Sequence, residues 1–393
     1  MGRLLIKNGR IIAQGKVLEG ESVLIDGGKI TAIGKLIEAP GAEVIDAGGA
    51  YVSPGFIDIH THGGGGADYM DGTKEAYLVA ARMNAIHGCT LLFPTTVTCS
   101  DEELFDSFET FRNAADENED GAILEGLHLE GPYFSPANAG AQDKEFIRNP
   151  EPSDYLEIMR RGKGIIKRWS FAPELDGAAE FAATISKEGI IASAAHTSAT
   201  FYECETAFKN GCSLLTHFFN CMSTISKTGP YKHAGVLEYG YYQDDMFVEI
   251  IADGIHVPQE LLRLILKIKG PDHIALISDA MRAAGMPEGR YIIGGLKCGR
   301  EVIVEDGVAK LPDRMHLASS VATTDRLVRT IMALTGCSIT DAVKMASTTP
   351  ARAMRIDDRK GSIAVGKDAD ITIFDDDVNI ISTIIGGRKV YQA

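Results

Sequence analysis

The chain has 393 residues, and at roughly 150 residues per domain this length predicts two or three domains with a core that needs no disulfides. Its net charge is −15, from 39 basic and 54 acidic side chains, which argues against nucleic acid or an anionic membrane as a partner. No run approaches the ~18 apolar residues of a membrane-spanning helix, and the first residues lack a secretion signal, so we expect no membrane contact. The seven cysteines include no CxxC pair, which makes a reducing cytoplasm the expected location.

The two ends of the chain share a β pattern. Residues 1–53 contain short runs of Val, Ile and Leu that are broken by Asn-Gly and Gly-Gly turns. Residues 350–393 end in the same pattern, GSIAVGKDADITIFDDDVNIISTIIGGRKVYQA. Neither end alone makes a stable sheet, and chain termini often lie close together. We therefore expect a small β-sandwich domain that is built from both termini.

Residues 54–349 alternate short apolar runs with amphipathic segments. The predicted strands are GAILEGLHLEG, GIIASAAHTS, CSLLTHFFN, MFVEIIADGIHV and HIALISDAM. The predicted helices include TKEAYLVAARMNAIHG, SATFYECETAFKNG and PQELLRLILKIKG, each closed by glycine. Alternating apolar strands and helices indicate a parallel sheet with helices outside it. About 300 residues of this pattern predict an α/β fold, a metal-dependent (β/α)8 TIM barrel.

The predicted strands end in side chains that can bind a metal or transfer a proton. These side chains are His60, His62, Glu130, His196, His217, His256 and Asp279. In a barrel, the carboxyl ends of the strands converge on one mouth. His60 and His62 are two residues apart on a predicted strand, so both imidazoles face the barrel axis. Imidazole and carboxylate suit Zn²⁺ and other borderline divalent ions.

Each of these features also has a simpler interpretation. A single strand-end histidine is more often a hydrogen-bonded structural residue, and only the joint pattern favours a metal site. The glycine run 63–66 is no phosphate loop, because no GK[ST] follows, and it either lets a ligand approach the backbone or forms a mobile loop. Cys221 has no base partner of its own in the sequence, which disfavours a nucleophilic cysteine.

The motifs around these residues resemble the N-acetylglucosamine-6-phosphate deacetylase family of the amidohydrolase superfamily. In chain order they are PGFID-HxH, HLEGPY, AHTSAT, THFFNCMS, ADGIHVP and SDAM, and the tail GSIAVGKDADITIFD is similar to the superfamily's closing β segment. The resemblance implies a hydrolase of a linear amide bond. Such an enzyme removes the acetyl group from N-acetyl-D-glucosamine 6-phosphate, giving D-glucosamine 6-phosphate and acetate in amino-sugar catabolism.

The resemblance also implies a ligand set. Glu130, His196 and His217 would bind one divalent metal, and His60 and His62 would hold a second, with Glu130 shared. No lysine ends a strand where many superfamily members carry a carboxylated lysine, and Glu130 would take that place. One or two ions per subunit are expected, zinc first and iron, cobalt or manganese as alternatives. Asp279 would carry a proton from water to the leaving amine, or it would be a further metal ligand.

The substrate contacts implied by the resemblance lie between and after these ligands. They are Ala141, Gln142, Asn220, Cys221, Lys232, His256, Leu317, Ala318 and Ser319. His256 would hold the scissile carbonyl, and HLASS resembles the family's LAGS loop with Ser319 in place of glycine. The family's phosphate-binding arginine is missing from STISKTGPYKHAG. Its replacement is open among Lys227, Lys232, Arg282 and Arg290.

Two other classes of function compete with this hypothesis. One is an amidohydrolase that acts on another N-acyl amino sugar or on a cyclic amide, of the dihydroorotase or hydantoinase type. The missing strand-end lysine and the HLEGP motif argue against the cyclic amide. The other is a non-catalytic barrel scaffold, which would be expected to have lost some ligands. We expect a small phosphorylated amino sugar as the partner and a homodimer as the assembly, since dimers are the commonest state.

Overall fold

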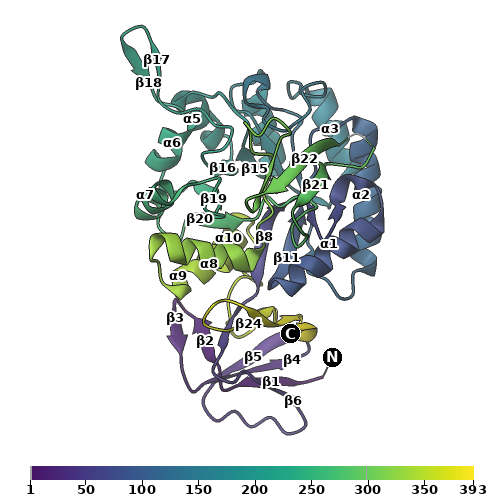
Figure 1. The fold of residues 1–393 in the computed structure, drawn as a ribbon, viewed down its shortest axis with the longest axis vertical. Coiled ribbons are helices and arrows are strands. Elements are labelled where there is room, and N and C mark those ends of the chain that lie inside the picture. The colour runs from purple at the N-terminus through teal and green to yellow at the C-terminus, as the bar shows by residue number, and fades with distance from the viewer. Residues whose placement is uncertain (1, 298) are drawn as a thin grey trace.

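The computed structural model describes residues 2–297 and 299–393 (Figure 1). Eight parallel strands form a barrel, in the order β8, β11, β13, β14, β15, β16, β19 and β20. Their bounds are Phe56–Thr61, Cys89–Pro94, Leu127–Glu130, Ile166–Phe171, Ile191–Ala194, Cys212–Leu215, Phe247–Ile251 and Ile274–Ile277. The short strand β12 (Ile123–Leu124) pairs in parallel with β11, just before β13 in the chain. The predicted (β/α)8 barrel is confirmed.

The barrel closes through backbone contacts at two seams. A parallel bridge joins Thr95 to His128 between β11 and β13, where Thr96 N–H donates to the His128 carbonyl over 3.0 Å. At the other seam, the N–H of Asp279 donates to the carbonyl of His60 over 2.9 Å. This second bond joins the last barrel strand to the first, and it brings two predicted site residues side by side.

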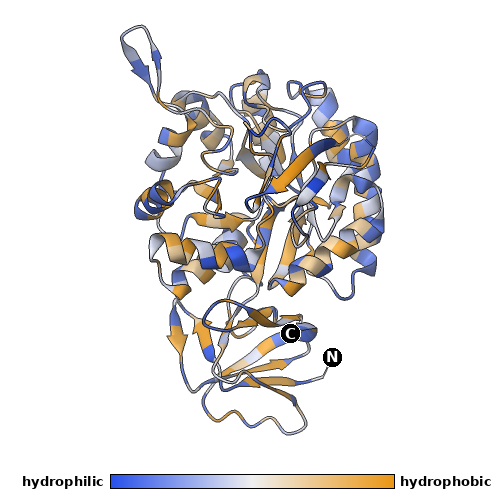
Figure 2. Ribbon diagram, in the orientation of Figure 1, coloured by the Kyte–Doolittle hydropathy of each residue, from blue (hydrophilic) through white to orange (hydrophobic). Residues whose placement is uncertain are grey.

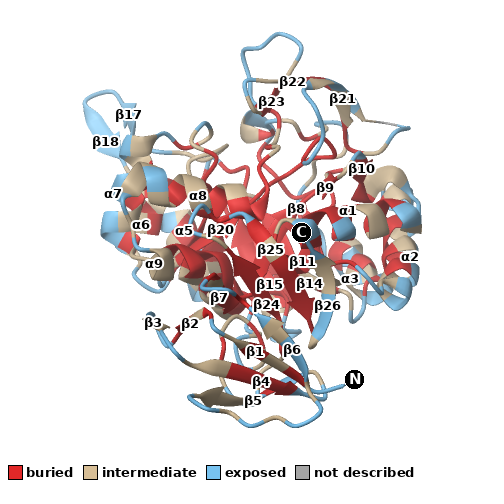
Figure 3. Cartoon of the chain, turned by 60° about the horizontal axis from the view of Figure 1, so that its bottom comes forward, coloured by how far each residue is buried: buried red, intermediate tan, exposed pale blue. Residues whose placement is uncertain are grey.

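Helices cover the outside of the barrel. They are α1 (Lys74–Ile86), α2 (Asp101–Glu117), α3 (Pro152–Arg161), α4 (Ala178–Lys187), α5 (Phe201–Lys209), α6 (Val236–Tyr242), α7 (Gln259–Lys269), α8 (Thr324–Thr335), α9 (Ile339–Val343) and α10 (Thr349–Ala353). Ser100 and Thr200 begin α2 and α5 with capping boxes, in which Glu103 and Glu203 bond back to the cap. The helices turn their apolar faces to the strands, so the barrel strands are buried on both sides (Figures 2 and 3).

Both termini form a second β unit below the barrel (Figure 1). One sheet has the order β5 (Lys29–Gly34), β4 (Ser22–Asp26), β1 (Leu4–Lys7), β6 (Glu43–Asp46). The other has the order β26 (Arg388–Gln392), β25 (Ile380–Ile385), β24 (Ile371–Phe374), β7 (Tyr51–Pro54), β2 (Arg10–Ala13), β3 (Lys16–Leu18). A buried aliphatic cluster from both ends of the chain lies between them, including Ile6, Val23, Ile371 and Ile384. The predicted sandwich of both termini is thus present.

The division into residues 1–53 with 350–393, and 54–349, stays a proposal. Helix α10 packs against the barrel strands β8 and β20, and Ala351 and Met354 join the aliphatic cluster at that end of the barrel. We propose that the barrel unit runs through this helix before the chain returns to the sandwich. Among the described residues, no helix is both long and apolar enough to cross a bilayer.

Small strands lie at the carboxyl ends of the barrel strands. A three-stranded sheet is formed by β21 (Gly289–Ile293), β22 (Arg300–Glu305) and β23 (Val308–Lys310). The hairpin β17 (Ser226–Thr228) and β18 (Tyr231–His233) projects away from the barrel and is exposed along its length (Figures 1 and 3). The short pair β9 (Gly63–Gly64) and β10 (Ala67–Asp68) follows the first barrel strand.

Candidate metal and active site

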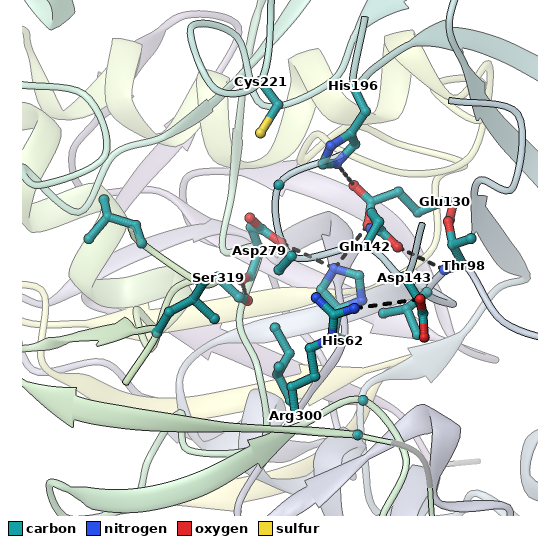
Figure 4. Close-up of a pocket in the computed structure, with 18 of the residues that line it drawn as sticks. His62, Thr98, Glu130, Gln142, Asp143, His196, Cys221, Asp279, Arg300 and Ser319 are labelled. Atoms are coloured by element: carbon teal, nitrogen blue, oxygen red, sulfur yellow. Dashed lines mark hydrogen bonds and ion pairs between the residues drawn. The ribbon is translucent and has the colours of Figure 1, made fainter. Parts of the chain in front are cut away.

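A cavity of about 620 Å³ opens at the carboxyl ends of the barrel strands. Loops after the barrel strands line one side of it, and the sheet β21–β22–β23 with the segment that follows lines the other. The candidate ligands His62, Glu130, His196 and Asp279 point into this space (Figure 4). His60 lies deeper, fully buried behind His62. The position is the one that the strand-end pattern predicts.

Six of the predicted residues come together in two groups of possible ligands. His60, His62 and Asp279 form one group, and Glu130, His196 and His217 form the other. Glu130 lies between the groups: its Oε1 is 3.1 Å from His217 Nε2 and 3.3 Å from His196 Nε2, and its Oε2 is 3.4 Å from His62 Nε2. Residues separated by more than 150 positions in the chain thus share one carboxylate.

The four histidines are held by Nδ1, so that their Nε2 atoms converge. The Nδ1 atom of His62 lies 3.2 Å from the carbonyl of Thr95, and that of His60 lies 3.3 Å from Glu249 Oε2. His196 and His217 bond through Nδ1 to the carbonyls of Asn138 and Asn220, at 2.9 and 3.2 Å. A carbonyl or carboxylate accepts only, so each Nδ1 carries a proton, and each Nε2 can present a lone pair to an ion once it has lost its own proton. This is the usual support of metal-binding histidines.

The separations between donor atoms fit a metal ion. Two ligands that are each ~2.1 Å from a tetrahedral ion are about 3.4 Å apart. His196 Nε2 and His217 Nε2 are 3.1 Å apart, and His60 Nε2 and His62 Nε2 are 3.3 Å apart. Asp279 Oδ1 is 3.2 Å from His62 Nε2. Two imidazole lone pairs at such distances repel each other unless a cation or a proton lies between them.

The electrostatics of the site also call for a cation. Burial raises the pKa of the Glu130 carboxyl, but the charge of His60 and the hydrogen bonds from His196 and His217 outweigh it and hold the pKa well below its ordinary value. Burial lowers the pKa of His62, but the hydrogen bond to Asp279 and the charge of Glu130 raise it to about 9. The buried carboxylates thus favour positive charge beside them, which a divalent ion can supply.

Three of the six candidate metal ligands have a backbone conformation that non-glycine residues seldom adopt. The φ angles of His196, His217 and Asp279 are 43°, 32° and 45°, all in the left-handed region. Ser319, opposite Asp279, has a φ of 70°, and its hydroxyl donates to the Asp279 carbonyl over 2.5 Å. Strain of this kind concentrates at functional sites, where the surrounding fold maintains it.

A buried charge network supports the two groups from below. Arg168 of β14 and Glu249 of β19 are fully buried and form an ion pair inside the barrel. Glu249 accepts from the backbone N–H of His217 over 3.1 Å as well as contacting His60, so one carboxylate supports a ligand from each group. Arg168 also donates to Ser193 and Thr216 at 3.0 and 2.7 Å.

Replacing Arg168 with methionine is expected to lower the free energy of unfolding by about 3–5 kcal/mol, because the buried Glu249 would lose its partner. Urea denaturation followed by circular dichroism measures the loss. The exposed pair of Arg160 with Glu157 provides a matched control, and Arg160→Met is expected to leave the free energy of unfolding almost unchanged. An Arg168→Met variant as stable as the control would contradict this account of the network.

Most of the predicted substrate contacts line the cavity. Those that do are Ala141, Gln142, Asn220, Cys221, His256, Leu317 and Ser319. Gln142 is fixed between the N–H of Thr98, at 2.8 Å, and Glu130 Oε2, at 2.7 Å. Asp253 accepts from His256 Nδ1 over 2.7 Å, which leaves the Nε2 of His256 available to a ligand.

Two predicted contacts are not found among the described residues that line the cavity. Ala318 is buried in the apolar cluster with Met281 and Val302, because its backbone N–H pairs with Ala309 and turns the side chain to the cluster. Lys232 lies on the exposed hairpin β17–β18, outside the cavity of its own chain. The sequence could not reveal either position, since both depend on how the loops fold back.

Two other expectations need correction. The glycine run 63–66 neither lines the cavity nor lacks packing: a Cβ at Gly64 would meet the methyl of Met83 at 1.9 Å, and one at Gly63 would meet the Ala67 carbonyl at 2.2 Å. Close packing against β10 at Gly63, and against α1 at Gly64, explains why these two positions are glycine. Cys221 does have a base beside it, because its thiol contacts the imidazole of His196. That imidazole is also bonded to Glu130 and Asn138.

No motif in the sequence predicts that the sheet β21–β22–β23 is part of the candidate site. Ile293 and Arg300 from this sheet, together with Met315 and His316 beyond it, line the cavity. Their segment is a set of short strands whose pattern resembles that of any hairpin. The Gly-Gly pair at 294–295 marks a turn, but nothing in the pattern says that the turn lies over the barrel mouth.

Comparisons with known proteins agree with the geometry. Curated N-acetylglucosamine-6-phosphate deacetylases of Bacillus subtilis and Mus musculus are 35% and 31% identical to the chain, each over 99% of it, and are themselves covered to 97% and 96%. An N-acetylgalactosamine-6-phosphate deacetylase of Escherichia coli O157:H7 is 31% identical over 90% of the chain and 91% of its own length.

Solved structures give the same result. N-acetylglucosamine-6-phosphate deacetylase of Pasteurella multocida superposes with a TM-score of 0.92 at 29% identity, covering 100% of both chains. A mutant of the Mycobacterium smegmatis enzyme in complex with N-acetyl-D-glucosamine-6-phosphate has a TM-score of 0.91 at 28% identity, again over 100% of both chains. Residues 51–390 match the amidohydrolase family. The chain therefore belongs to the amidohydrolase family.

Proposed function

We propose that the protein is a metal-dependent N-acetylglucosamine-6-phosphate deacetylase. It hydrolyses the acetamide of N-acetyl-D-glucosamine 6-phosphate to acetate and D-glucosamine 6-phosphate, in amino-sugar catabolism. The observation that carries this proposal is the convergence of four histidine Nε2 atoms on the Glu130 and Asp279 carboxylates at one cavity. The substrate class is supported by the names of relatives that match almost the whole chain.

The residues present fit a divalent metal. Glu130, His196 and His217 would hold one ion, and His60 and His62 would hold a second, with Glu130 shared between them. A bound divalent ion would supply the Lewis acid that activates water and polarises the amide carbonyl. Buried imidazole and carboxylate donors favour zinc, and we propose zinc as the native metal. Metal analysis of the purified protein, beside reconstitution with iron, cobalt and manganese, tests this choice.

Asp279 is proposed to move the proton of the reaction. Burial raises the pKa of this carboxyl, but the charge of His60 and the hydrogen bond from His62 outweigh it, so the group is held as a carboxylate. A carboxylate at the cavity surface can take a proton from the attacking water and return it to the departing sugar nitrogen. The water oxygen then forms the new bond to the acetyl carbon, and the C–N bond breaks to release the amine.

His256 is proposed to orient the acetyl carbonyl. The carboxylate of Asp253 bonds to its Nδ1 and to its backbone N–H, at 2.7 and 2.8 Å, which fixes the ring. A fixed donor that faces the oxygen where negative charge develops stabilises the tetrahedral state. Gln142 and Asn220, beside the ligands, are proposed to contact the sugar.

A substrate panel tests the proposed function. Acetate release is measured with N-acetylglucosamine 6-phosphate, N-acetylgalactosamine 6-phosphate, N-acetylglucosamine, a hydantoin and dihydroorotate. We expect the highest kcat/KM with the first compound. A preference for the galacto sugar would favour the activity named for the Escherichia coli O157:H7 relative. Turnover of the cyclic amides alone, or of nothing in a metal-loaded protein, would overturn the proposal.

The assembly and location are also proposed. We propose a homodimer, because closed two-fold dimers are the commonest assembly of soluble enzymes. Light scattering coupled to size-exclusion chromatography tests it. We propose a cytoplasmic location, which is supported by the cysteines of the described chain, all of them free thiols.

A further inference from the structure

The charged side chains around the cavity are unevenly distributed. Five acids line it: Glu103, Glu130, Asp143, Asp279 and Asp313. Among the described residues that line it, Arg300 of β22 is the single lysine or arginine. A dianionic substrate that enters this acidic cavity needs a permanent cation, and the metal ligands lie at the opposite, deep end. Arg300 is therefore the one permanent cation that the described lining of the cavity offers to such a substrate.

The other candidate cations lie elsewhere or are fully engaged. Arg282 is buried, and its guanidinium bonds to Asp71 and to the carbonyls of Ile292 and Gly294 at 2.8, 2.6 and 2.6 Å. Arg290 is exposed, pairs with Glu301, and does not line the cavity. Lys227 and Lys232 lie on the exposed hairpin β17–β18. None of the four faces the cavity of its own chain.

Arg300 has a partner that it can exchange. Its Nη2 is 3.5 Å from Asp143 Oδ1, and the two side chains are 47% and 40% exposed. Figure 4 shows Arg300 reaching from its strand into the cavity, where this contact joins it to the loop that carries Gln142. A long, half-exposed ion pair is worth little. A phosphate group can accept two parallel hydrogen bonds from a guanidinium. The contact with Asp143 involves a single, distant carboxylate oxygen, so a phosphate would bind Arg300 more strongly.

We propose that Arg300 binds the phosphate group of the substrate and releases Asp143 when it does so. The inference rests on the proposed function for the identity of the substrate, and it assigns the phosphate contact to the sheet β21–β22–β23. The sugar then spans the cavity, with its acetamide at the six candidate ligands and its phosphate at the rim. Specificity for phosphorylated sugars then comes from the sheet β21–β22–β23 of the same chain, at the rim of the cavity.

The test compares Arg300→Gln with wild type on a phosphorylated and an unphosphorylated sugar. With N-acetylglucosamine 6-phosphate, KM is expected to rise at least about tenfold and kcat to stay within about twofold, because a charge-assisted bidentate contact is lost. With N-acetylglucosamine, kcat/KM should be the same in both proteins. Arg300→Lys should recover part of the loss, since it restores a point charge but not the fork. A merely structural role would affect both sugars alike.

Three further variants sharpen the test. Arg290→Gln, on the same sheet and exposed, is the matched control and should keep the wild-type KM. Asp143→Asn should lower the KM for the phosphorylated sugar, because the competing charge is gone, and a KM that is not lower would overturn the exchange. A wild-type KM in Arg300→Gln, or a loss found in Lys232→Gln in its place, would overturn the assignment.

Failure of the proposed function can be told apart from failure of this inference. If metal-loaded wild type releases no acetate from either sugar, the proposed function is wrong. Calorimetric titration with inorganic phosphate then tests Arg300 directly. Wild type is expected to bind phosphate at least about tenfold more tightly than Arg300→Gln does. Equal binding would overturn the inference.

Discussion

Replacing Asp279 with asparagine is expected to lower the rate of acetate release by about 10²- to 10⁴-fold, the range that positioned proton transfer supplies. The change keeps the shape of the side chain but removes its ability to accept a proton. Asp279 is the carboxylate of its group, 3.2 Å from His62 and 3.5 Å from His60. The group of Glu130, His196 and His217 is left intact, so metal content should stay near wild type.

Two measurements on the same samples of Asp279→Asn distinguish a role in proton transfer from a role as a metal ligand. Acetate release gives the rate, and metal analysis gives the ions per chain. Asp120→Asn, in an exposed pair with Arg82, is the control for a remote loss of charge. Full activity in Asp279→Asn would remove this residue from the mechanism. Loss of metal along with activity would favour the role of a ligand.

Replacing Glu130 with glutamine is expected to lower both metal affinity and activity by at least about 100-fold. Metal binding requires negative charge to offset the desolvation of the ion, and Glu130 is the carboxylate shared by both groups. Four neutral imidazoles and Asp279 would remain, without the central donor. Competition with a chelator of known affinity measures the change in metal binding.

Two controls distinguish a lost ligand from a lost fold in Glu130→Gln. Glu157→Gln, on the surface of α3, should bind metal as wild type does. Circular dichroism should show a folded protein, since glutamine keeps the volume and can still bond to Gln142. A variant that keeps its metal and its turnover would show that Glu130 is not the shared ligand.

The strand-end pattern could predict the candidate site because the barrel topology itself brings the ends of the strands, and the side chains that follow them, together. His60, Glu130 and His196 are far apart in sequence, yet each follows an apolar run, and parallel strands bring their carboxyl ends to one rim. The period of two along a strand places His60 and His62 on the same side. Neither statement requires knowledge of a side-chain contact, which is why the sequence alone could predict that these six side chains come together.

Other parts of the fold gave no such pattern. The barrel strand β14 carries Lys167, Arg168 and Trp169, and a buried arginine hides it from any search for apolar runs. Its partner Glu249 is 81 residues away, so the compensation is visible only in three dimensions. The rim sheet that carries Arg300 was missed because local hairpin patterns do not say where a hairpin lies. Both the burial of Arg168 against Glu249 and the position of the rim sheet depend on packing between segments that are far apart in the sequence.

The scaffold alternative is weakened by the geometry. A barrel that no longer served catalysis would not need to keep His196, His217 and Asp279 in a left-handed backbone conformation, at a cost of about 1–3 kcal/mol each. It would also not need four Nδ1 atoms held so that the Nε2 atoms converge.

The central claim is that the converging histidines and carboxylates hold the divalent metal that makes amide hydrolysis possible. The most direct measurement is a titration of chelator-stripped protein with zinc, following bound metal and acetate release from N-acetylglucosamine 6-phosphate in the same samples. We predict almost no release without metal and a rise in proportion to bound zinc, with a plateau at one or two ions per chain. Full activity in stripped protein, or a protein that binds no zinc at these residues, would contradict it.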